Sequence, residues 1–147
     1  MPFLSSNSGA LYEDSDSLKT ISIKGTVVSG KQEASKFTKL PWVKKQIAEK
    51  LGFTPYNGTL NIRLTKEDRT RLKETLKKAK PIEIVPAEGY YRGRCFKAIL
   101  MNNLECVIVA PEVTDYPEDL VEIIASTNLR EKLRFKDGDT VVVKVLI

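Results

Sequence analysis

Short stretches of alternating or β-branched apolar residues, separated by turn residues, recur along most of this 147-residue chain. The clearest of them is the terminal run TVVVKVLI, which follows the turn Asp137-Gly138-Asp139. β-Branched residues favour strands, whereas Gly and Asp favour tight turns between strands. Several short strands with turn signals, and only short helices between them, are typical of a barrel. We therefore predict a mainly β fold that closes, or nearly closes, into a single β-barrel.

The pattern of apolar residues also predicts the order of the elements. Strands are expected at 21–28, 59–64, 81–86, 92–101, 104–110 and 140–147, with a weakly alternating segment at 119–126. Helical spacing predicts a helix at 41–51 with Gly52 just past its end, a second helix after a capping box at Thr65 and Asp68, and a short helix within 126–135.

Composition excludes several classes of chemistry. The chain has no His and only two cysteines, Cys95 and Cys106, so we expect neither a Cys/His zinc site, a histidine base nor a disulfide framework. The net charge of +5 suits a polyanionic ligand, although lysines that keep a small domain soluble explain it as well. We expect a cytoplasmic protein without a membrane span, in which residues 1–18 form a disordered tail and residues 19–147 one domain.

The segment LGFTPYNGTLNIRL at 51–64 holds the best candidate for a site. If a strand starts near Gly58, the side chains of Thr59 and Asn61 point to the same side because alternate residues of a strand share a face. Their two neutral oxygens are ligands that Mg²⁺ accepts, together with water and substrate phosphates. The alternative is that both are ordinary polar residues on the wet face of a half-buried strand.

Four blocks resemble the archaeal CTP-dependent riboflavin kinase family. They are GTVVSG at 25–30, LGFTPYNGTLNIRL at 51–64, APEVTDYPEDLVEIIASTNLRE at 110–131 and KDGDTVVVKV at 136–145. The resemblance implies a cradle-loop β-barrel of about six strands with Greek-key-like connections. It also implies a kinase that transfers the γ-phosphoryl group of CTP to the 5′-hydroxyl of riboflavin with Mg²⁺, giving FMN and CDP.

The resemblance assigns roles to individual residues. It implies that Thr59 and Asn61 bind Mg²⁺, and that Thr114 and Glu122 contact the flavin. The nucleotide is expected at Lys31, Gln32, Glu33, Ala34, Ser35, Lys36, Thr127, Asn128, Leu129 and Arg130. The family's glycine-rich loop has Gln32 and Ala34 in place of two glycines here, which is expected to alter the grip on the triphosphate.

Glu122 is the candidate for orienting or deprotonating the riboflavin hydroxyl. It should face opposite to Val121 and Ile123, toward the mouth of the barrel. We expect CTP and riboflavin as small-molecule partners, no nucleic acid and a monomer. Two alternatives remain: a nucleic-acid-binding barrel that uses the basic helix at 66–78, and a degenerate kinase that binds flavin or nucleotide without turnover.

Overall fold

Six strands close into an antiparallel barrel in the computed structural model of the chain, which describes residues 20–29, 38–87, 93–101, 103–111 and 119–146. The expected tail, the segment 31–36 and Thr114 lie outside these residues. The strands are β1 (Thr20–Val28), β2 (Leu60–Leu64), β3 (Ile82–Ile84), β4 (Gly93–Leu100), β5 (Leu104–Pro111), β6 (Leu120–Ile124) and β7 (Thr140–Leu146). The helices are α2 (Pro41–Leu51), α3 (Lys66–Lys78) and α4 (Leu129–Leu133). The predicted fold class is confirmed.

The sheet has the order β3-β4-β5-β6-β2-β1-β7, and it closes because β4 also pairs with β7. The first half of β4 pairs with the short strand β3, and its second half pairs with β7. Strands far apart in sequence are therefore neighbours, as with β2 and β6. This pairing brings the segment around Thr59 beside the segment around Glu122.

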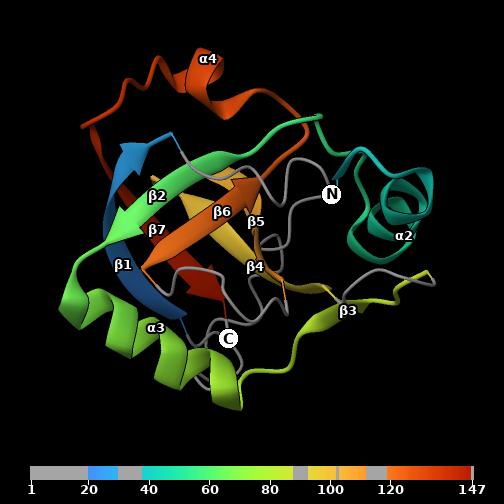
Figure 1. Ribbon diagram of the computed structural model, residues 1–147, viewed down its shortest axis with the longest axis horizontal. Helices are drawn as coiled ribbons and strands as arrows, with labels where there is room; N and C mark the ends of the chain where they lie inside the picture. Colours follow the sequence, from blue (N-terminus) through green and yellow to red (C-terminus); the bar gives the residue numbers. More distant parts are fainter. Residues whose placement is uncertain (1–19, 30–37, 88–92, 102, 112–118, 147) are drawn as a thin grey trace, which may run out of the picture.

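Alternate residues of all six barrel strands fill the interior. Ile23, Ile62, Ile108, Ile123 and Val143 belong to this buried cluster, together with Leu72 and Leu76 of α3 and Leu129 of α4. Burying such a side chain fully contributes roughly 1.5–3 kcal/mol. Figure 1 shows α3 and α4 at opposite ends of the barrel, where their apolar residues close it.

Helix α2 lies outside the barrel, next to β3 (Figure 1). Its residues Val43, Ile47 and Leu51 pack against outward-facing residues of the wall, including Val107 and Ile124. Gly52 ends the helix with a φ of 84°, as its position in the sequence predicts.

Two side chains of α2 also bind the backbone of β3 and of the residue after it. Gln46 donates to the Val85 carbonyl at 3.0 Å and accepts from the Val85 amide at 2.8 Å. Lys50 donates to the Glu83 carbonyl at 2.6 Å. These bonds hold the helix to the outer edge of β3.

Most expected boundaries agree with the structure, and one detail differs. Thr59 lies just before β2 rather than on it. The β4–β5 hairpin is present, and Met101 in its turn adopts a φ of 60°. The Thr65 cap of α3 and the two free, buried cysteines are as expected. No helix in the described part of the chain is long and apolar enough to cross a membrane.

Candidate active site

The pairing of β2 with β6 places two polar side chains opposite each other. Asn61 of β2 is the direct partner of Glu122 of β6. Their neighbours Ile62 and Ile123 belong to the barrel interior, so Asn61 and Glu122 lie on the outer face of the wall. Glu122 thus faces opposite to Ile123 as predicted, but it lies on the outer face rather than at the mouth of the barrel.

Three side chains meet on this outer face. The Thr59 hydroxyl donates to Glu122 Oε1 at 3.0 Å, and Asn61 Nδ2 lies 3.4 Å from Thr59 Oγ1. Glu122 has no exposed surface, and Asn61 is 6% exposed. The alternative of polar residues on a wet strand face is therefore wrong for Asn61, because its carboxamide is buried.

The carboxamide oxygen of Asn61 is the most unusual atom of this cluster. Oδ1 is buried and has no hydrogen-bond partner among the described residues. A buried polar oxygen without a partner costs free energy, so such an atom calls for a ligand or another explanation. The hydroxyl of Thr59 lies beside the same carboxamide, and both groups offer the neutral oxygens that Mg²⁺ accepts.

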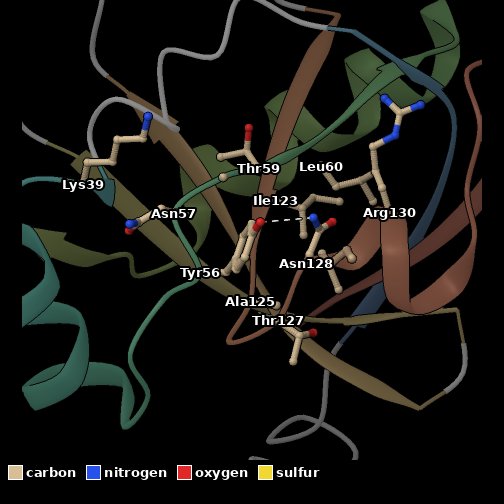
Figure 2. Close-up of a pocket in the computed structure, with 12 residues that line it drawn as sticks. Lys39, Tyr56, Asn57, Thr59, Leu60, Ile123, Ala125, Thr127, Asn128 and Arg130 are labelled. Carbon is tan, nitrogen blue, oxygen red and sulfur yellow. Dashed lines mark hydrogen bonds between the residues drawn. The ribbon is translucent and has the colours of Figure 1, made fainter.

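A pocket of about 270 Å³ begins at Thr59 and extends toward α4. Its lining residues come from the chain before α2, the loop before β2 and the start of β2, the end of β6, and the segment that leads into α4 with the first residues of that helix. They are Lys39, Tyr56, Asn57, Gly58, Thr59, Leu60, Ile123, Ala125, Thr127, Asn128, Leu129 and Arg130. In Figure 2, Lys39 and Arg130 extend on opposite sides of Thr59, so positive charge flanks the pocket.

The floor of the pocket is held by bonds between its two walls. Asn128 Nδ2 donates to the Tyr56 hydroxyl at 3.2 Å (Figure 2), and the Tyr56 amide donates to the Ala125 carbonyl at 2.8 Å. Asn128 Oδ1 accepts from the Glu131 amide at 3.2 Å and so caps α4. The loop before β2 is thereby fixed to the start of α4.

The structure brings together all of the predicted site residues that it describes. Thr59, Asn61 and Glu122 form one cluster, and Thr127 to Arg130 line the pocket that Thr59 borders. Of the latter, Leu129 also packs into the barrel interior. Lys31 to Lys36 and Thr114 lie outside the described residues.

Sequence reasoning missed Lys39, Tyr56 and Asn57 as lining residues. Tyr56 and Asn57 belong to the turn that directly precedes Thr59, so their closeness to the site was a usable signal. A single lysine such as Lys39, in a chain with 24 basic residues, carried no such signal.

Comparisons with known proteins place the chain among relatives of one family. The family model CTP-dep_RFKase, described as a domain of unknown function (DUF120), matches residues 27–145. The riboflavin kinase of Methanosarcina barkeri is 36% identical over 138 residues, which cover 89% of this chain and 59% of the relative. The riboflavin kinase of Archaeoglobus fulgidus is 43% identical over 133 residues, which cover 87% and 56%. The chain thus spans a little over half the length of these curated relatives.

Proposed function

Because the chain belongs to the CTP-dependent riboflavin kinase domain family, we propose that it transfers the γ-phosphoryl group of CTP to riboflavin, giving FMN and CDP. One observation of the structure supports this activity independently of the family membership. The buried cluster of Thr59, Asn61 and Glu122 adjoins the pocket that Arg130 and Lys39 flank. A carboxylate, two neutral oxygens and two cations beside one pocket suit phosphoryl transfer, which depends mainly on positioning and electrostatics.

We assign Thr59 and Asn61 as the residues that hold Mg²⁺. The buried Oδ1 of Asn61, without a partner among the described residues, supports this assignment. When bound, Mg²⁺ neutralises charge on the phosphate oxygens. Glu122 holds the Thr59 hydroxyl from the other side, and this fixes the direction in which the Thr59 oxygen presents its lone pairs.

The pocket receives the nucleotide in this proposal. The segment Thr127 to Arg130 contacts the cytidine and its phosphates, together with residues 31–36, and Thr114 with Glu122 contacts the flavin. The riboflavin 5′-hydroxyl oxygen bonds to the γ-phosphorus while the bond from that phosphorus to the β-phosphate oxygen breaks, so CDP leaves. Glu122 is the group that takes the hydroxyl proton.

The test is FMN formation from riboflavin, Mg²⁺ and each of CTP, ATP, GTP and UTP. Product with CTP alone supports the proposal, and product with another nucleotide revises the donor, as the replaced glycines at Gln32 and Ala34 would allow. Retained flavin binding without any product supports the degenerate kinase. Salt-dependent oligonucleotide binding without flavin binding supports the nucleic-acid-binding barrel.

Variants separate the roles of the three clustered residues. Thr59→Val combined with Asn61→Leu removes both proposed metal ligands and is expected to abolish Mg²⁺-dependent turnover. Glu122→Gln keeps an acceptor for the Thr59 hydroxyl but removes the base, so turnover should fall while CTP affinity stays nearly the same. Unchanged turnover of Glu122→Gln would exclude Glu122 as the base.

A further inference from the structure

The carboxylate of Asp137 joins a residue of the pocket wall to the residue that follows β1. Its Oδ1 accepts from Arg130 Nη2 at 2.8 Å, and its Oδ2 accepts from the Ser29 hydroxyl at 3.1 Å. Arg130 lines the pocket, and Ser29 directly follows β1 and precedes residues 30–37. One side chain therefore links the pocket wall to the residue from which that segment starts.

Asp137 itself sits on a turn that is fixed to β1. The Gly138 amide donates to the Val27 carbonyl and the Val27 amide donates to the Asp139 carbonyl, both at 2.8 Å. Asp139 Oδ2 accepts from the Lys136 amide at 2.8 Å, and Gly138 adopts a φ of 97° that favours glycine. These hydrogen bonds fix the position of the turn, and therefore of the Asp137 backbone, relative to β1.

Arg130 needs such a support because its own helix is short. Helix α4 has five residues, and the Arg130 side chain is 36% exposed. A guanidinium group carries five N–H donors, so the single bond to Asp137 leaves donors for a phosphate. The hydrogen bond from Arg130, followed by that from Ser29, lowers the pKa of Asp137, so the carboxylate stays charged at neutral pH.

We propose that Asp137 is a positioning residue for the nucleotide, which holds the Arg130 guanidinium at the pocket and ties it to Ser29 directly after β1. This inference rests on the proposed function, because it takes the ligand of the pocket to be a nucleotide with a phosphate chain. Asp137 acts through Arg130 and does not itself contact the phosphates.

A binding experiment with a matched control tests this. CTP affinity is measured by titration calorimetry for the wild type, Asp137→Ala and Asp119→Ala. The Asp119 carboxylate pairs with Arg63 at 3.1 Å and lies outside the pocket lining, so its removal breaks the same kind of ion pair elsewhere. We expect Asp137→Ala to weaken CTP binding roughly three- to tenfold and Asp119→Ala to leave it unchanged.

A double-mutant cycle separates positioning from a general effect on the fold. In the background of Arg130→Ala, the Asp137→Ala change should have less than about a twofold further effect, because the group through which Asp137 acts is gone. In FMN formation, Asp137→Ala should raise the KM for CTP and leave kcat and the KM for riboflavin within about twofold. Asp137→Asn, which keeps the side-chain shape, should show the same trend if Asp137→Ala does not fold.

Three outcomes would overturn the inference. The first is an unchanged CTP affinity in both Asp137 variants, and the second is tighter CTP binding in either of them. The third is a double variant whose loss of CTP affinity equals the product of the losses caused by Asp137→Ala and Arg130→Ala alone. A wild-type protein that binds CTP and forms FMN while these outcomes occur leaves the proposed function intact. A wild-type protein that neither binds CTP nor forms FMN overturns both proposals.

Discussion

Replacing Asn61 by Leu is expected to make the metal-free protein more stable while removing its response to Mg²⁺. The buried Oδ1 has no partner among the described residues, and such an atom costs about 1–3 kcal/mol. Among the described residues, the carboxamide makes one hydrogen bond, from Nδ2 to Thr59 Oγ1, which is long at 3.4 Å and contributes little. A leucine, whose side chain has as many heavy atoms as that of asparagine but no polar ones, therefore gains about 1–2 kcal/mol, which corresponds to a Tm higher by roughly 3–6 °C in a domain of this size.

The assay is thermal and urea unfolding, first with a chelator and then with increasing Mg²⁺. Wild type should gain stability with Mg²⁺, by about 2.7 kcal/mol at a hundred times the Kd, whereas Asn61→Leu should gain none. The order of stability therefore inverts between the two conditions. Asn103→Leu, a change at an exposed hairpin asparagine, is the control and should keep the wild-type response to Mg²⁺.

Two results would refute this reasoning. A lower stability of Asn61→Leu in chelator would mean that Oδ1 is already satisfied in the metal-free protein and does not need a cation as its partner. An undiminished Mg²⁺ response of Asn61→Leu would mean that the ion binds elsewhere.

Three further predictions concern stability and reactivity. Gly25→Ala should lower the free energy of unfolding in urea by about 1–3 kcal/mol, because a Cβ at Gly25 would lie 3.0–3.1 Å from atoms of β2. An unchanged urea midpoint would show that β1 and β2 can move apart at no cost. Burial raises the pKa of Cys95 and of Cys106 to about 12, so iodoacetamide at pH 8 should label neither thiol in the folded protein and both in urea; labelling of the folded protein would contradict their burial. The hydrogen bond from Arg130 lowers the pKa of Asp137 below its ordinary 3.8, so the stability it contributes is present above pH 3.8 and is lost as the pH falls through the folded-state pKa. As the pH is lowered, the free energy of unfolding should therefore fall more steeply for wild type than for Asp137→Asn. Parallel curves of unfolding free energy against pH would contradict the lowered pKa.

Local sequence signals were enough to predict the strands and helices and much of the site. The alternation in 59–64 placed Thr59 and Asn61 on one side, and the capping box at Thr65 marked the start of α3. These features depend on neighbours within a few residues, where periodicity and capping chemistry apply directly.

Contacts between residues far apart in the sequence could not be predicted from local sequence patterns. Spacing put Asn61 on a face of its strand, but its burial follows from the β2–β6 register, which sets it against Glu122. The bond between Ser29 and Asp137 joins residues 108 positions apart. Nothing local marks such a pair, because the closure of the barrel alone brings them together.

The attachment of α2 to β3 determines how much of the end of the sheet stays open to another strand. β3 ends the sheet order, and a terminal strand with unpaired amides and carbonyls can recruit a strand from a neighbouring molecule. The carboxamide of Gln46 imitates a peptide group by occupying both polar atoms of Val85, and the ammonium of Lys50 occupies the Glu83 carbonyl. These backbone groups are therefore already paired within the chain and cannot pair with a strand of a second molecule.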